Sequence, residues 1–568
     1  MGLNGALQIG RSAILTSQAA ISVAGNNMAN AATPGYHRQV ANLSPSRPEA
    51  IGRNQFVGTG VSLVSVNRAI DTALQARLRD AISDENSATI DERFLTAVET
   101  IQNELSNDDL SSRLSAFFNA FSELANNPLD DAVRTVVMQQ GVSVADHVNL
   151  IRDEYTTLRN EVDRSLGSAV DRVDGLLEEI ATINGSITAA EGGQGGTTGG
   201  ANSLRDRRDQ LIDELSGFLE VTTIDQPNGA VDILVGSIPL VLAGESRGLQ
   251  LRTESSPSGT EVSVRVGDDG SILQIESGSI GALMRQREDT IQPAIDALDG
   301  FAGQLAFQVN RVHSQGQGSS LRSSFTGSVE LADTSANLGG SYSGLPFEIE
   351  NGSFQLHVVD PASGHRSTYQ VTVDPQNDSL DDIIDRINVD LAIPDVTALA
   401  GPDGQFVLRA ATGREIAFSE DTSGFLAAMG VNGFFTGTDA TSLAVDQDLL
   451  DDPSLLSTSD DFTPGGNGAA LAMVSLEESP VDAFGGRSLR EEWQASVNEL
   501  AVKTGAARTS LESSRLVKAS LEAQSQGVSG VSLDEEAIDL MTLQRQFQAA
   551  ARFITVIDEA MQVLLSIA

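Results

Sequence analysis

Cysteine is absent from the 568-residue sequence. Its absence excludes disulfide bonds, thiol catalysis, thiolate zinc sites and iron–sulfur clusters. No apolar run approaches the roughly 18 residues that a membrane-spanning helix needs. The segment from Met1 to Ala24 also lacks the basic region that opens a secretory signal. We therefore expect neither a membrane span nor a cleaved signal peptide.

Positive charge and aromatic residues are both scarce. The chain has 36 basic and 78 acidic residues, a formal net charge of −42, and an aromatic content of 4%. A surface this acidic repels nucleic-acid phosphates and anionic membranes, so neither is expected as a partner. Because rings are few, Leu, Ile, Val and Ala must fill the cores, which favours long helices packed along seams. At about 150 residues per domain, the length predicts three or four domains.

The sequence predicts no catalytic, cofactor-binding or metal-binding residue. Residues 244–248 match the pattern of a hydrolase nucleophile elbow, but residues 249–253 resemble a strand where the elbow needs a helix. His357 and His365 flank a turn, and two histidines on a hairpin do not make a metal site, so we expect both to be exposed. Acidic clusters at 451–452 and 460–461 lack the spacing of a calcium loop, which leaves loose calcium binding open.

Both ends of the chain carry a heptad pattern of apolar and small residues. Near the amino terminus it comprises Leu3, Leu7, Gly10, Ile14, Ser17, Ile21, Ala24 and Met28. Near the carboxyl terminus it comprises Leu540, Leu543, Phe547, Ala550, Ile554, Ile557, Met561, Leu564 and Ala568. A lone amphipathic helix cannot bury its stripe. The two helices therefore pair with each other or with other copies of the chain, unless both are core helices of one globular domain.

The first helix is expected to stop within residues 25–36, because asparagines there compete for backbone hydrogen bonds and a proline follows. This segment resembles the amino-terminal signature of the flagellar axial proteins, the family of rod, hook and hook-associated proteins. The residues that carry the resemblance are Asn26, Asn27, Ala29, Asn30, Thr33, Pro34, Gly35 and Tyr36. Residues 529–537 and 543–552 are similar to the carboxyl-terminal signature of the same family.

Interior segments resemble the hook-associated members of that family in particular. They include Leu-Ala-Asn-Asn-Pro-Leu-Asp-Asp-Ala-Val-Arg at 124–134, Leu-Arg-Asp-Arg-Arg-Asp-Gln-Leu-Ile-Asp-Glu-Leu at 204–215, and residues 229–236 and 465–472. One departure is Gly466, where the family usually has an acidic residue. The resemblance covers both termini and much of residues 90–315, and residues 330–450 match weakly.

The resemblance implies a structural subunit that catalyses no reaction, polymerises as a ring at the distal end of the hook and connects it to the filament. Its implied partners are other copies of itself, hook protein, a second junction protein and a cytoplasmic export chaperone on the carboxyl-terminal helix. It implies an extracellular place in the flagellum, reached through the flagellar secretion apparatus. Alternatives are a hook or rod axial subunit and, in a different class, a secreted adhesin or hydrolase.

The expected fold is mainly α with β-rich insertions, arranged in four domains. Residues 1–38 and 528–568 form a terminal coiled-coil domain at the inner tube. Residues 39–218, 277–325 and 466–527 form a long-helix core. Residues 219–276, which alternate with period two, form a small β insertion. Residues 326–465 form an outer β-rich domain.

Overall fold

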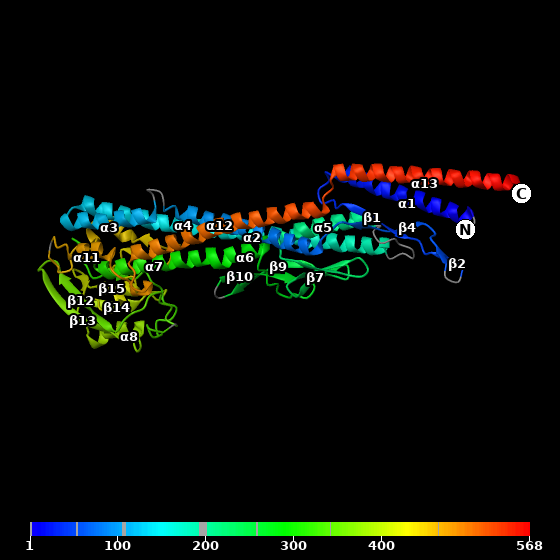
Figure 1. The fold of residues 1–568 in the computed structure, drawn as a ribbon. Coiled ribbons are helices and arrows are strands. Elements are labelled where there is room, and N and C mark those ends of the chain that lie inside the picture. The colour runs from blue at the N-terminus through cyan, green and yellow to red at the C-terminus, as the bar shows by residue number, and fades with distance from the viewer. Residues whose placement is uncertain are drawn as a thin grey trace. The chain divides into compact units, whose positions relative to one another are not determined.

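The computed structural model describes residues 3–52, 55–104, 109–191, 201–256, 259–340, 342–463 and 465–567. The fold is mainly helical, as predicted, with several small antiparallel sheets (Figure 1). Contacts divide the chain into unit 1, which comprises Met1–Arg93, Val162–Gln286 and Ala506–Ala568, and unit 2, which comprises Phe94–Glu161 and Arg287–Gly505. This division cuts through long helices and differs from the four expected domains, which stay a prediction.

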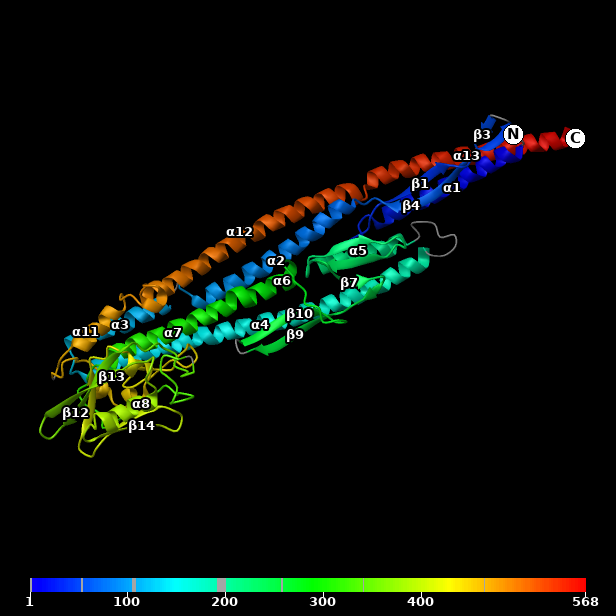
Figure 2. The ribbon, with the colours of Figure 1, turned by 90° about the horizontal axis from the view of Figure 1, so that it is seen from below.

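Helices that contribute residues to both units are α2 (Thr72–Gln102), α4 (Asp131–Glu191) and α12 (Leu489–Ser529). Unit 1 also contains α1 (Leu3–Asn30), α5 (Asn202–Ser216), α6 (Gly278–Arg285) and α13 (Leu533–Ile567). Helix α1 ends within residues 25–36, as predicted, and α13 begins seven residues before the heptad pattern that starts at Leu540. They run side by side in both views (Figures 1 and 2). Among the described residues, no helix is long and apolar enough to cross a membrane.

Residues 39–68, which we assigned to the long-helix core, form strands instead. Strands β1 (Gln39–Pro45) and β4 (Val61–Arg68) pair antiparallel, and the short β2 (Glu49–Gly52) and β3 (Gln55–Val57) pair between them. Strand β4 is rich in β-branched residues, with valine at 61, 64 and 66, and such residues favour strands. The hairpin of β1 and β4 lies against α1, where the Ser12 hydroxyl accepts a hydrogen bond from the Val61 amide at 3.2 Å.

The predicted β insertion of unit 1 contains two sheets. In one, β5 (Thr222–Asp225), β6 (Val231–Val235), β7 (Ile238–Leu242) and β8 (Glu245–Ser246) pair in sequence order. In the other, β9 (Leu249–Ser256) pairs with β10 (Gly259–Val266). Because β9 begins directly after Gly248, the elbow-like segment is followed by a strand, as predicted.

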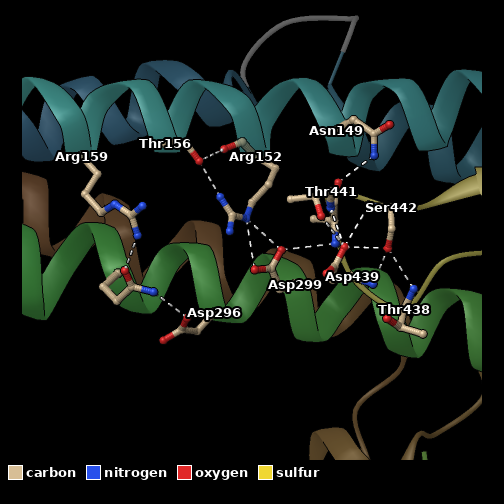
Figure 3. A network of polar contacts seen from close by, with 12 residues as sticks. Asn149, Arg152, Thr156, Arg159, Asp296, Asp299, Thr438, Asp439, Thr441 and Ser442 are labelled. Carbon is tan, nitrogen blue, oxygen red and sulfur yellow. Dashed lines mark hydrogen bonds and ion pairs between the residues drawn. The ribbon is translucent and has the colours of Figure 1, made fainter. Parts of the chain in front are cut away.

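The longer helices of unit 2 are α3 (Leu110–Asn126), α7 (Gln292–His313), α11 (Gly468–Leu476) and parts of α2, α4 and α12. A polar network joins two of them, α4 and α7. Figure 3 shows Arg152 of α4 against Asp299 of α7, at 2.9 Å. Asn149, one turn earlier, donates to the Ala440 carbonyl at 2.7 Å. The network fixes α4, α7 and the loop at 438–442 to one another.

The β-rich part of unit 2 has a core of its own. It contains two three-stranded sheets. The strand order of the first is β11 (Ser324–Thr326), β15 (Phe406–Ala410), β14 (Val396–Ala400). The strand order of the second is β13 (His365–Val373), β12 (Gly352–Asp360), β16 (Glu415–Ser419). Strands β17 (Phe435–Thr436) and β18 (Ala444–Val445) pair separately, and α8 (Leu380–Asp385), α9 (Phe425–Ala428) and α10 (Gln447–Asp451) are short. Buried residues of this core include Phe354, Leu356, Val371, Leu380, Phe406 and Phe418.

The prediction that His357 is exposed is wrong. Strand β16 pairs with β12 on the side opposite β13, so the imidazole is covered from both sides and contacts the hydroxyls of Thr368 and Ser419, each at 2.8 Å. Burial lowers the pKa of His357 to about 4. His365 is exposed, as predicted.

Acid should destabilise unit 2 through His313, the last residue of α7. Its Nε2 accepts from the Ser457 amide at 3.1 Å, its Nδ1 contacts the Asn432 carbonyl at 2.8 Å, and burial lowers its pKa to about 4. Because the pKa of His313 is lower in the folded chain than its unfolded value of about 6.5, the folded state is stabilised at pH values above 6.5. This stabilisation is lost as the pH falls from 6.5 towards 4. Between pH 7.5 and 5 we expect a loss of about 2 kcal/mol from this residue.

The measurement is the free energy of unfolding of wild type and His313→Gln at both pH values. The variant is expected to be less stable at pH 7.5 and to lose about 2 kcal/mol less on acidification, the remaining loss coming from groups such as His357. Equal losses in both proteins would show that His313 does not titrate on unfolding.

Candidate assembly site at the paired chain ends

Helices α1 and α13 pack against each other in antiparallel orientation. Gly10 near the start of α1 lies against Ile554 near the end of α13, whereas Asn27 near the end of α1 contacts Glu536 near the start of α13. Of the possibilities left open by the heptad pattern, pairing of the two ends within one chain is therefore what the structure shows.

The predicted seam residues mostly face this pairing. Ala550 and Ile557 of α13 and the small residues Gly10, Ser17 and Ala24 of α1 are buried. Partly buried are Leu3, Leu7, Ile14, Ile21, Met28, Leu540, Leu543, Phe547, Ile554 and Met561. Leu564 is exposed, and Ala568 lies outside the described residues. The contact between α1 and α13 buries most of the seam within one chain, and a role of the seam in assembly stays a proposal.

A second apolar stripe on α13 has no cover within the described part of the chain. It comprises Ala549, Phe553, Val556, Ala560 and Val563, all exposed, and we call it the outer stripe. The 4-3-4-3 spacing of these residues is that of a heptad seam. Our sequence analysis missed this stripe because the longer heptad pattern from Leu540 to Ala568 gave the stronger signal.

Gly10 allows the two helices to approach closely. A Cβ at this position would lie 2.6 Å from Cγ1 of Ile554, whereas a Cβ at Gly25 of the same helix would meet nothing within 4 Å. We expect Gly10→Ala to destabilise the helix pair, and Gly25→Ala to stabilise α1 by about 0.5–1 kcal/mol, because glycine is a poor helix former. Thermal unfolding of the two variants measures both effects. Equal shifts would mean that α1 and α13 do not meet at Gly10.

Asn27 is a buried residue of the asparagine-rich segment at 25–36. Its side chain is 1% exposed and bridges three chain segments. The amide nitrogen donates to the Gln39 carbonyl at 2.9 Å and to Glu536 Oε2 at 3.1 Å, while the amide oxygen accepts from the Gln39 backbone N–H at 2.9 Å. A buried amide with all these partners satisfied fixes the geometry of the segments around it.

Arg38 and Glu536 form the second link between the two family signatures. Arg38 Nε donates to Glu536 Oε1 at 2.7 Å, and the Arg38 backbone N–H donates to the Ser529 carbonyl at 2.9 Å. The hydrogen bond that Arg38 donates to Glu536 raises the pKa of Arg38. Glu536 itself is 2% exposed, so a buried carboxylate holds the start of α13 against the end of α1.

The remaining signature residues shape the turn after α1. Asn30 donates to Asn26 Oδ1 at 3.0 Å, and the Thr33 amide donates to the Asn30 carbonyl at 2.9 Å. The Tyr36 hydroxyl donates to Asn27 Oδ1 at 2.8 Å. Burial, with the nearby carboxylates of Asp206 and Glu536, raises the pKa of Tyr36 to about 12, which keeps this donor protonated. Ala29 and Pro34 are exposed.

The motif at 204–215 forms α5 and contacts this turn. Gln210 donates to the Pro34 carbonyl at 2.5 Å, and Gly35 has a φ of +71°, with Gln210 so close that a Cβ there would collide with it. His37 Nδ1 lies 2.8 Å from Asp206. The sequence signal for these contacts was the alternation of arginine and aspartate in the motif, which we did not connect to the amino-terminal segment.

A cavity of about 760 Å³ lies where these elements meet, lined by residues 31–38, 525–532 and parts of α2 and α5. No group of three or more metal-ligating side chains is found among the described residues. The hydrogen bonds and ion pairs described above join both chain ends to the body of unit 1.

Two profiles of known protein families match parts of the chain. The profile of the flagellar hook-associated protein FlgK helical domain matches residues 95–324, and that of the flagellar basal body rod FlgEFG protein C-terminal region matches residues 524–567. The matched segments are the helical middle and the carboxyl-terminal end of the chain.

Similar proteins cover between 55% and 98% of the chain. Flagellar hook-associated protein 1 of Escherichia coli (strain K12) is 23% identical over 567 residues, or 98% of each chain. The protein of that name from Bacillus subtilis (strain 168) is 28% identical over 343 residues, or 55% of this chain and 67% of that one. A solved structure of the flagellar hook junction protein FlgK from Burkholderia pseudomallei has a TM-score of 0.49 at 16% identity and covers 80% of this chain and 100% of that one. The chain is therefore similar to flagellar hook-associated protein 1 over nearly its whole length, and to the FlgK helical domain over residues 95–324.

Proposed function

We propose that this chain is a structural subunit of the bacterial flagellum that polymerises at the distal end of the hook and connects the hook to the filament. The names of its relatives and the two matched profiles support this function. The family is a structural one. The chain acts through surfaces that neighbouring subunits cover.

The outer stripe on α13 is the observation that carries the proposal. Val556 and Val563 are 62% and 57% exposed although they continue a heptad spacing, and Phe553 beside them is also exposed. An apolar stripe of this kind marks a protein interaction site. We propose that other copies in a ring cover it, so that the seam joins α1 to α13 and the outer stripe joins subunit to subunit.

We further propose that one face of the ring meets hook protein and the other meets a second junction protein. The signature residues 26–36 set the angle at which the helix pair leaves the body. Before assembly the same outer stripe would need cover, which supports a cytoplasmic export chaperone bound to α13. Export through the flagellar secretion apparatus, without a cleaved signal, fits this order of events.

A hook or rod subunit is the second candidate within the family, because the carboxyl-terminal profile is that of rod proteins. The helical-domain match over residues 95–324 favours the junction protein. The secreted adhesin or hydrolase has no observation in its favour.

Deletion of the gene tests the function. We expect electron micrographs of the deletion strain to show complete hooks without filaments and flagellin in the culture medium, with filaments restored by the wild-type gene. A strain that lacks hooks would indicate a hook or rod subunit instead, and a strain with ordinary filaments would contradict a junction role.

A further inference from the structure

A second cavity in unit 1, of about 470 Å³, is lined by charged side chains. They are four arginines, Arg68, Arg79, Arg205 and Arg208, and three acids, Glu191, Asp209 and Asp225. The lining therefore holds four positive and three negative charges, and Asp213 outside it pairs with Arg79. The cavity is rich in arginine, in a chain whose net charge is −42.

Three of the four arginines have carboxylate partners. Arg68 contacts Asp209 at 2.7 Å and Arg205 contacts Glu191 at 2.6 Å. Arg79 contacts Asp213, also at 2.7 Å. These pairs balance the charges that they involve.

Arg208 has no such partner. It is 2% exposed, and its NH1 group donates to Asn184 Oδ1 at 3.1 Å and to the Gly229 carbonyl at 2.8 Å, both of them neutral acceptors. Its Nε is buried without a hydrogen-bond partner, as is the Nε of Arg205. Among the described residues, no carboxylate contacts this guanidinium. Asp209 and Asp225 act on its charge without contacting it, and burial still lowers the pKa of Arg208 to about 10. A buried charge without a contacting counter-charge is unfavourable, so an anion that reached it would be strongly held.

We propose that this cavity binds a compact oxyanion of the phosphate class, with Arg208 supplying a guanidinium that no carboxylate contacts and Arg205 a second guanidinium. Planar guanidinium groups suit such an anion because they donate paired, charge-assisted hydrogen bonds. The bound anion would tie together α5, the end of α4 and the turn between β5 and β6. This site lies apart from the assembly surface on α13 and does not depend on the proposed function.

Inorganic phosphate is the probe, and the melting temperature of the purified chain is the readout, with chloride at matched ionic strength as reference. We expect phosphate to raise the melting temperature of wild type in a saturable way. Arg205→Gln should weaken the apparent affinity for phosphate about tenfold or more, since it removes a charge-assisted donor. Glu191→Gln should strengthen it, because a competing carboxylate is lost.

The matched control is Arg207→Gln, the exposed neighbour whose contact is Glu179, outside the cavity. Its phosphate response should equal that of wild type. The alternative is that Arg208 only anchors the turn at Gly229. Phosphate would then shift the melting temperature no more than chloride, or Arg205→Gln and Arg207→Gln would respond alike, and either result overturns the proposal.

Discussion

Replacing Glu536 with alanine should loosen the helix pair from the body of unit 1 and reduce stability by about 2–3 kcal/mol. Glu536 is 2% exposed and accepts from Asn27 and from Arg38. Its removal leaves Arg38 without its closest counter-charge and takes a partner from the buried Asn27 amide. Chemical denaturation of the purified chain measures the loss, and counts of attached filaments should fall with it.

Glu535→Ala is the matched control. Glu535 lies beside Glu536 in the first turn of α13, so both substitutions remove one charge from the same helix terminus. However, its side chain is 68% exposed and lies 3.8 Å from Arg38, so we expect a loss below about 0.5 kcal/mol. Similar losses in the two variants would show that the buried contact with Asn27 and Arg38 does not hold the helix pair.

Val556→Asp should abolish attachment of filaments while leaving the isolated chain as stable as wild type. Val556 is exposed on the outer stripe, where the proposed contact with another copy would bury the new carboxylate. Burial of an unpaired carboxylate is costly by several kcal/mol, and each 1.4 kcal/mol lowers an association constant tenfold. Melting temperature and filament counts in the complemented deletion strain measure the two parts of the prediction.

Two further variants separate the two faces of α13. Thr555→Asp adds the same charge one residue away, on an exposed polar position, and should assemble normally. Ile557→Asp places it at a position that is 6% exposed against α1, and should destabilise the isolated chain as well. Filaments on cells that carry Val556→Asp, or loss of filaments with Thr555→Asp, would contradict assignment of the outer stripe to assembly.

Periodicity predicted the long helices and the β insertion, because an apolar period of about 3.5 or of 2 records which face of an element is buried. It gave no prediction of the strands within residues 39–68, which we placed in the long-helix core domain. It also failed at His357, because burial there depends on β16, which is 55 or more residues away in sequence. Local pattern carries no information on which distant strand will pair.

The site was predictable only in part. The small residues Gly10, Ser17 and Ala24 indicated close packing of a helix, and the structure supplies α13 as the partner. The contact between Asn27 and Glu536 joins positions 509 residues apart, and neither residue type indicates the other. Glu536 had the appearance of an ordinary acidic residue at the start of a helix, and only its burial marks it as a structural contact.

Labelling of an introduced cysteine tests most directly whether the outer stripe is the assembly surface. Because the chain has no cysteine of its own, Val556→Cys gives a single reactive site. We expect its thiol to react readily with a maleimide in the isolated chain and at least about tenfold more slowly in assembled flagella. Ser363→Cys, in the exposed turn between β12 and β13, should react equally in both states. Equal labelling of Val556→Cys in the two states would contradict the account.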